Sequence, residues 1–126
     1  MGNGTSIGRV RALGSAHTGA HHWLVQRYTA IGNLVAGLFL VISLAGLPDW
    51  TFKTMHDWLH RPLPATMLGL FVISTFWHAR LGLQVLVEDY VHEHANKFAS
   101  MALLSLLSFA GAAFGLLCVL RIALGS

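Results

Sequence analysis

The chain has 126 residues, of which 55% are hydrophobic and only 10% are charged. Soluble domains carry roughly a quarter charged residues, so this composition excludes an ordinary water-soluble fold and indicates a membrane protein. The formal net charge of +3 comes from residues that lie mainly near the ends of apolar segments, where cations anchor to lipid, and it therefore gives no support to nucleic-acid binding.

The first segment, residues 1–19, is polar and rich in glycine, and we predict that it is a tail outside the membrane. It has no apolar stretch of the kind that a cleavable signal peptide requires, so insertion is expected to use the first spanning helix itself. His21 and Arg27 follow at the mouth of that helix. Taken alone, they are interpreted as a water-exposed histidine and an arginine that reaches lipid phosphates.

Three segments are apolar over a length that can cross a bilayer, which takes about 20 residues. These segments are residues 26–47, 64–88 and 98–121. They do not alternate polar and apolar faces as the helices of a soluble bundle would. We therefore predict an all-α fold: one transmembrane domain over residues 1–126 with three spanning helices.

Two further features predict how these helices are joined and packed. The loop between the first two spans repeats Phe52, Met55 and Leu59 at helical spacing, which predicts a short helix lying in the membrane interface. The third span carries Gly111 and Gly115 four residues apart. Small residues at this spacing let two helix backbones approach closely, so this face is predicted to be a packing surface.

One stretch of the second span combines groups that are unusual in a membrane. His78 is an ionisable residue well inside the span, where such a group is expensive and suggests a function. Ser74 and Gly82 lie one turn on either side and leave space beside it, and Asp89 and Tyr90 follow about three turns later near the water. An interhelical hydrogen bond, a proton relay and axial ligation of haem iron all remain open for the histidine. The residues alone favour the hydrogen bond.

The predicted topology relates the ends of the first two spans. Two spans separate Arg27 from Asp89, so both lie at the same face of the membrane. His21, Arg27, Asp89 and Tyr90 can therefore converge there. Basic residues are slightly more numerous on this side, which predicts a cytoplasmic N-terminus.

The pattern around the second span resembles a known family. It consists of His78, Gly82 four residues later and an Asp89-Tyr90-Val segment that begins eleven residues after the histidine. A histidine six residues before an arginine, ahead of the first of three spans, strengthens the match. Together these features resemble the smaller membrane anchor subunit of succinate dehydrogenase, respiratory complex II. Arg80 departs from the pattern, because relatives often have an aromatic residue there, and its role is left open between lipid phosphates and a partner subunit.

The resemblance implies a subunit of an oxidoreductase of the tricarboxylic acid cycle and electron transport, without succinate-oxidising catalysis of its own. It implies that His78 is one axial ligand of the iron of haem b, which is shared with a cytochrome b556-like second anchor subunit. It implies that Tyr90 and Asp89 bind ubiquinone. The residues that it places around the haem and its propionates are His21, Arg27, Ser74 and Gly82.

The partners that the resemblance implies are the second anchor, an iron–sulfur subunit and a flavoprotein subunit, beside membrane lipid. The location implied is the inner membrane of a bacterium, with a mitochondrial inner membrane as the alternative. Because His22 adjoins His21, the sequence leaves open which of the two faces the haem. Two other functions stay open: a haem-free structural anchor, in which His78 joins helices, and a small proton or ion channel.

Overall fold

The computed structural model describes residues 17–125, which form four helices. They are α2 (His17–Ala45), α3 (Phe52–His60), α4 (Pro62–Tyr90) and α5 (His94–Ala123). Three of them are long and apolar enough to cross a membrane, which confirms the predicted all-α transmembrane fold. Most of the predicted tail, residues 1–19, lies outside the described residues.

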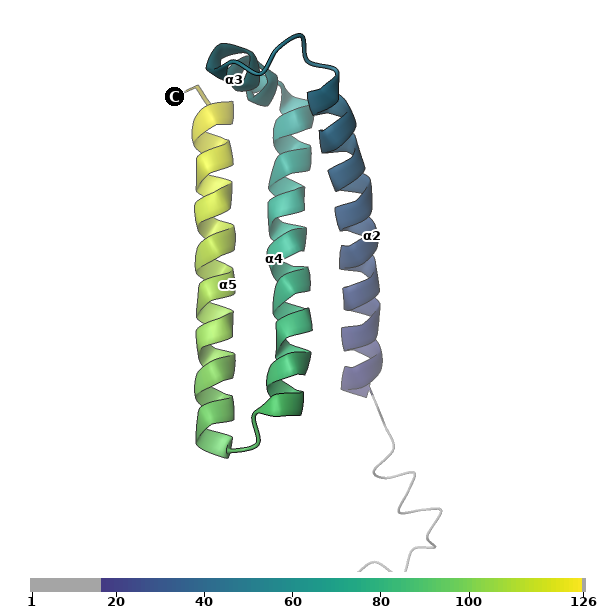
Figure 1. Ribbon diagram of the computed structural model, residues 1–126, viewed down its shortest axis with the longest axis vertical. Helices are drawn as coiled ribbons and strands as arrows, with labels where there is room; N and C mark the ends of the chain where they lie inside the picture. The colour runs from purple at the N-terminus through teal and green to yellow at the C-terminus, as the bar shows by residue number, and fades with distance from the viewer. Residues whose placement is uncertain (1–16, 126) are drawn as a thin grey trace, which may run out of the picture.

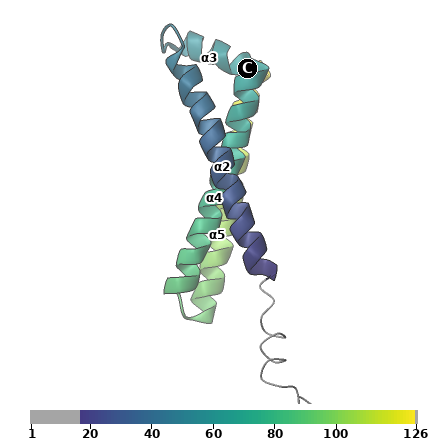
Figure 2. The ribbon, with the colours of Figure 1, turned by 90° about the vertical axis from the view of Figure 1, so that its right-hand side faces the viewer.

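The three long helices stand in a row with α4 in the middle (Figure 1). α4 packs against α2 on one side and α5 on the other, and the described parts of α2 and α5 do not meet. Seen from the side, α2 crosses α4 at an angle (Figure 2). The short helix α3 lies across one end and contacts α4 and α5.

Five of the six helix ends lie outside the predicted spans, and the exception is the C-terminal end of α2, which stops at Ala45 rather than at residue 47. α2 begins at His17 rather than at residue 26, and α4 and α5 each start and finish outside their apolar segments. α4 has 29 residues, which gives a length of about 43 Å, whereas the hydrocarbon core is about 30 Å thick. The apolar pattern predicts only the part of each helix that lies in the hydrocarbon core. The backbone can stay helical beyond it, in the polar interface region.

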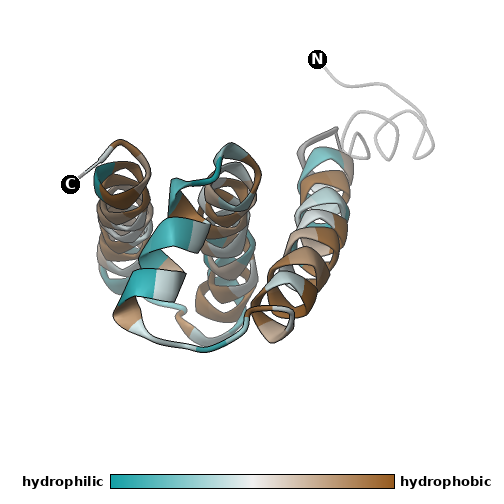
Figure 3. Cartoon of the chain, turned by 90° about the horizontal axis from the view of Figure 1, so that it is seen from above, coloured by the Kyte–Doolittle hydropathy of each residue, from teal (hydrophilic) through white to brown (hydrophobic). Residues whose placement is uncertain are grey.

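Few side chains are buried within this row of helices. Large apolar side chains are exposed on all three long helices, as contact with lipid or with another subunit requires. Figure 3 shows apolar residues along the long helices and more hydrophilic residues on α3. The buried apolar residues of the described chain are Ala36, Leu40, Trp58, Leu81 and Val119.

The contact between α4 and α5 depends on the two glycines of the third span. A Cβ added to Gly115 would lie 2.8 Å from Cγ1 of Val72, and one added to Gly111 would overlap the ring of Phe76. Both glycines therefore face α4 at close approach. This confirms that the Gly111–Gly115 face is a packing surface.

The predicted short helix between the first two spans is confirmed as α3. Its N-cap is Thr51, whose hydroxyl accepts a hydrogen bond from the Thr54 backbone at 3.4 Å. The Asp49 carboxylate accepts hydrogen bonds from the Thr54 hydroxyl at 2.5 Å and the Thr51 hydroxyl at 2.8 Å. These bonds, with the Thr51 backbone N–H, hold the pKa of Asp49 below its usual value. At the other end of α3, buried Trp58 donates from Nε1 to the hydroxyl of Ser43 in α2 at 2.6 Å.

Candidate functional site

His78 meets Thr29 across the contact between α4 and α2. The histidine is half-buried, and its Nδ1 lies 3.1 Å from Oγ1 of Thr29. The same hydroxyl donates within its own helix, to the carbonyl oxygens of Val25 at 2.9 Å and Gln26 at 3.0 Å. One turn before His78, the Ser74 hydroxyl donates to the Thr29 carbonyl oxygen at 3.1 Å. Thr29 is therefore held to α4 through both its side chain and its backbone.

These contacts belong to a line of polar groups between the two helices. One turn further along α2, at a more exposed position, Thr75 Oγ1 donates to Asn33 Oδ1 at 3.3 Å. Toward the other end, a Cβ added to Gly82 would lie 3.9 Å from Nε2 of Gln26, so Gly82 also faces α2. We call this set the polar seam, and its members are Gln26, Thr29 and Asn33 of α2 with Ser74, Thr75 and His78 of α4. Hydrogen bonds of this kind hold helices together in lipid, where no water competes for them.

A cavity of about 460 Å³ opens beside the polar seam. Its lining includes Thr29, Gly32, Ser74 and Trp77, and a Cβ on Gly32 would already lie 3.5 Å from the Ser74 hydroxyl. The small residues thus leave apolar space between α2 and α4 at the level of Ser74, one turn from His78, which does not itself line the cavity. Ser74 lines this cavity, whereas Gly82 faces Gln26 instead.

The second ring nitrogen of His78, Nε2, is left open. It has no hydrogen-bond partner among the described side chains, and it is not one of the buried unpartnered atoms, which are His22 Nε2 and Gln26 Oε1. Within residues 17–125, no three His, Cys, Asp or Glu side chains come together as a metal site. Nε2 of His78 is therefore available to a group that the described side chains do not supply.

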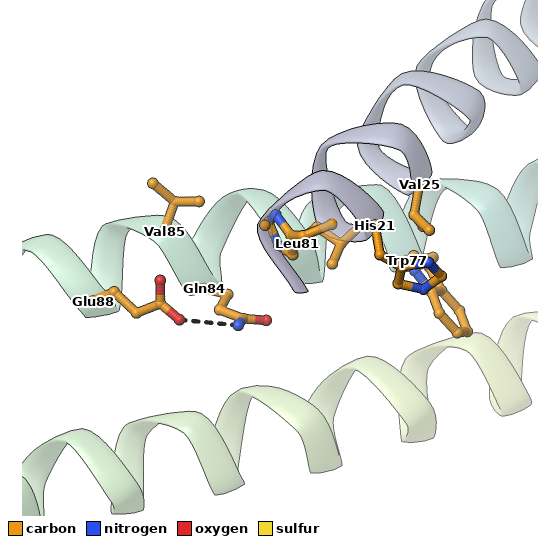
Figure 4. Close-up of a pocket in the computed structure, with 9 residues that line it drawn as sticks. His21, Val25, Trp77, Leu81, Gln84, Val85 and Glu88 are labelled. Carbon is orange, nitrogen blue, oxygen red and sulfur yellow. Dashed lines mark hydrogen bonds between the residues drawn. The ribbon is translucent and has the colours of Figure 1, made fainter. Parts of the chain in front are cut away.

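An open groove of about 690 Å³ lies at the start of α2, against the C-terminal half of α4. Figure 4 shows His21 and Val25 of α2 over this groove, with Gln84 donating to Glu88 of α4 at 3.0 Å. His21 and His22 both line it, but His21 is exposed, whereas His22 is half-buried with its Nε2 buried and unpartnered. Of the two histidines that the sequence left open, His22 is the one directed into the bundle.

The remaining predicted site residues lie at the same end of the bundle but do not touch one another. Arg27 is exposed, and its guanidinium stacks over the ring of Trp23 at 4.9 Å. It is two residues from Thr29, about 200° around the helix, so it faces away from α4. Asp89 and Tyr90 are exposed at the end of α4, close to the start of α5, and the Tyr90 side chain is 78% accessible.

Arg80 has a partner that the sequence did not identify. Its Nε and Nη2 atoms donate to the hydroxyl of Ser105 in α5 at 3.3 and 3.1 Å, and the guanidinium carbon lies 6.0 Å from the centre of the Phe109 ring. The arginine thus turns toward α5, on the side of α4 away from His78. Thr29 was missed as well. In the sequence, Thr29 is recognisable only as a hydroxyl residue inside the first span. That does not reveal which residue of another helix it contacts.

Comparison with known proteins gives one consistent family. The family described as "Succinate dehydrogenase/Fumarate reductase transmembrane subunit" matches residues 1–116. The succinate dehydrogenase hydrophobic membrane anchor subunit of Rickettsia bellii is 36% identical over 85 residues, 68% of each chain. The same subunit of Rickettsia conorii is 32% identical over 70% of this chain and 71% of its own. The succinate dehydrogenase membrane anchor subunit of Reclinomonas americana is 29% identical over 72% of this chain and 78% of its own. This chain therefore belongs to the succinate dehydrogenase/fumarate reductase transmembrane subunit family, among the membrane anchor subunits of succinate dehydrogenase.

Proposed function

We propose that this anchor subunit shares haem b with a second anchor subunit and that His78 supplies one axial ligand to the iron. The observation that carries the proposal is the state of the His78 ring, whose Nδ1 is held by Thr29 while Nε2 is open. Histidines that ligate metals characteristically have their other ring nitrogen held by a hydrogen bond of this kind. When bound, haem b supplies a one-electron redox centre whose potential depends on its axial ligands.

The surroundings of His78 fit a flat group that another subunit also contacts. Ser74 and Gly32 leave apolar space one turn from His78 on one side, and Gly82 adds no side chain one turn away on the other. No second histidine lies at this depth in the described helices, so the other ligand would come from the second anchor. His21, or its inward-facing neighbour His22, would meet a propionate at the end of α2. Arg27 faces away from α4, so its role requires a propionate to extend to the side of α2 that the second anchor covers.

We also propose that Tyr90 and Asp89 form part of a site for ubiquinone. A phenol hydroxyl can donate a hydrogen bond to the quinone carbonyl oxygen, where negative charge develops during reduction. A neighbouring carboxylate can orient that phenol or pass protons to it. Both residues are exposed at the end of α4, which leaves room for a ligand between this chain and another subunit.

The complex that this function requires contains an iron–sulfur subunit and a flavoprotein subunit beside the two anchors. Succinate would be oxidised on the flavoprotein, and electrons would pass through iron–sulfur centres to the quinone without the dicarboxylate touching this chain. We place the complex in the inner membrane of a bacterium, with the N-terminus in the cytoplasm, and take a mitochondrial inner membrane as the alternative. The bacterial sources of most relatives support the first location.

His78→Ala in the assembled complex tests the haem proposal. We expect the low-spin haem spectrum to be lost or shifted, because one axial bond to iron is removed. His92→Ala, which changes an exposed histidine outside the helices, is the matched control and should leave the spectrum unchanged. An unaltered low-spin spectrum in His78→Ala would refute ligation by this residue.

Tyr90→Phe tests the quinone proposal, because it removes the hydroxyl and keeps the ring. We expect quinone reductase activity to fall severalfold, whereas succinate oxidation with an artificial acceptor that takes electrons upstream should stay near normal. The control is Tyr28→Phe, since Tyr28 is the other tyrosine of the chain and is also exposed. Equal loss of both activities would assign Tyr90 to assembly, and loss of neither would place the quinone site elsewhere.

A second candidate function is a structural anchor without haem. The hydrogen bond between His78 and Thr29 favours it, because a bond that joins α2 to α4 gives the histidine a structural role without any haem. The absorption spectrum of the purified complex separates the two functions. A low-spin haem signal that depends on His78 supports shared ligation, and a complex that is active and free of haem supports the structural anchor.

A further inference from the structure

We propose that Thr29 is a positioning residue that holds the proton of the His78 ring on Nδ1 and thereby keeps Nε2 unprotonated for a metal. This inference rests on the proposed haem function and adds a residue of α2 to it. No functional expectation from the sequence included Thr29.

The argument starts from the single hydrogen of the threonine hydroxyl. Oγ1 of Thr29 lies 2.9 Å from the Val25 carbonyl oxygen and 3.0 Å from that of Gln26, and a carbonyl oxygen can only accept. Threonine in a helix commonly donates to the carbonyl three or four residues earlier. Its hydrogen is therefore directed back along α2, away from the histidine.

The side of Oγ1 that faces His78 then carries a lone pair. Since Nδ1 lies 3.1 Å from this oxygen, a hydrogen bond between them requires Nδ1 to be the donor. A neutral imidazole has only one N–H, so Nε2 must be unprotonated. That is the form in which the ring binds a metal, and Nε2 is the nitrogen that the described side chains leave open.

The structure also fixes where Thr29 stands relative to the histidine. The Ser74 hydroxyl donates to the Thr29 carbonyl oxygen at 3.1 Å, one turn from His78 on the same helix. This bond sets the depth of Thr29 against α4, so its side chain meets the ring rather than the turn above or below. A hydrogen-bond acceptor at Nδ1 also fixes the orientation of the ring. It increases the electron density that Nε2 can donate to a metal.

Thr29→Val tests the inference, because valine keeps the shape of threonine and removes the hydroxyl. In membranes that contain the assembled complex, we expect Thr29→Val to raise the midpoint potential of the haem and to shift its low-spin electron paramagnetic resonance signal. Without the hydrogen bond at Nδ1, the imidazole donates less electron density to the iron. The oxidised state of the iron is then less well stabilised. Thr29→Ser keeps a hydroxyl and should restore both readings.

Thr75→Val is the matched control. It removes a hydroxyl that also bonds across the polar seam, to Asn33 Oδ1 at 3.3 Å, without touching His78. An unchanged potential and signal in Thr29→Val, or an equal change in Thr75→Val, would overturn the assignment of Thr29. If Thr29→Val does not assemble, Thr29→Ala, which leaves space instead of a methyl group, gives the same comparison.

His78→Ala separates this inference from the function on which it rests. Loss of the low-spin signal in His78→Ala together with no effect in Thr29→Val refutes only the role of Thr29. A low-spin signal that persists in His78→Ala refutes ligation by His78, and the role of Thr29 with it.

Discussion

Replacing Gly115 by alanine tests how closely α4 and α5 approach each other. The side chain that the new methyl group would meet is Val72 of α4, which has little freedom to rotate. The added Cβ would lie 2.8 Å from Cγ1 of Val72, whereas two carbon atoms attract best at about 3.5–4.0 Å. Valine is branched at Cβ and has one strongly preferred rotamer in a helix, so Val72 cannot rotate away cheaply. The two helices must therefore move apart, and the contacts around this point weaken.

The size of the effect follows from two opposing terms. Forcing an extra methyl group into a packed contact costs about 1–3 kcal/mol. Alanine in place of glycine gains up to about 1 kcal/mol of helix propensity. Gly69→Ala in α4 makes the same chemical change at the same interface, but its Cβ would lie at an ordinary 3.6 Å from Cδ2 of Leu116. The propensity gain cancels between the two variants, so Gly115→Ala should be less stable than Gly69→Ala by about 1–3 kcal/mol.

The measurement is the free energy of unfolding of the full chain in mixed micelles, titrated with a denaturing detergent and followed by circular dichroism. Val72→Ala combined with Gly115→Ala supplies a double-mutant cycle, because removing the valine methyl groups makes room for the new Cβ. We expect the double variant to regain part of the loss. If Gly115→Ala is as stable as Gly69→Ala, the close approach of α4 and α5 at this point is wrong.

Three further predictions concern the other polar contacts of the bundle. Ser105→Ala should lower the same free energy of unfolding by about 1–3 kcal/mol, because Arg80 loses its acceptor, and Arg80→Leu in the same chain should recover most of it. Trp58→Phe should cost at least about 0.5–1.5 kcal/mol in the same titration, because the bond to Ser43 is lost with part of the buried ring. The folded-state pKa of Asp49 is lowered, so its support of α3 is complete above the usual value of 3.8 and is lost as pH falls through the lower folded value. Amide chemical shifts of α3 should follow this loss at acid pH, and Asp49→Asn should abolish the dependence.

The sequence was sufficient for features that depend on solvent or on local spacing. A helix surrounded by lipid must be apolar over its whole circumference, so three long apolar segments predict three spanning helices whatever their packing. The short helix α3 follows from apolar residues at helical spacing, such as Phe52 and Met55. Gly111 and Gly115 identify a packing face, because only small residues permit such an approach.

The pairing of particular side chains could not be predicted in this way. Whether His78 meets Thr29 or another hydroxyl depends on the rotation and depth of α2 against α4, which a single-residue pattern does not contain. The bond between Arg80 and Ser105 likewise depends on the rotation and depth of α5 against α4. Helix ends were also missed, since the α2 helix continues through polar residues that lie beyond the apolar segment. The assignments of haem and quinone residues stay predictions.

The central position of α4 explains how one histidine can be held in a fixed direction by three helices. Its side toward α2 carries His78 and Ser74, and its side toward α5 carries Arg80, about 200° from the histidine. Hydrogen bonds on both sides, together with the glycine contacts of α5, oppose rotation of α4 about its axis. The guanidinium group of Arg80 lies on the side of α4 away from the imidazole, where it bonds to Ser105. A single spanning helix would offer the same histidine without a fixed direction, so the packing of three helices is what orients the His78 ring within the bundle.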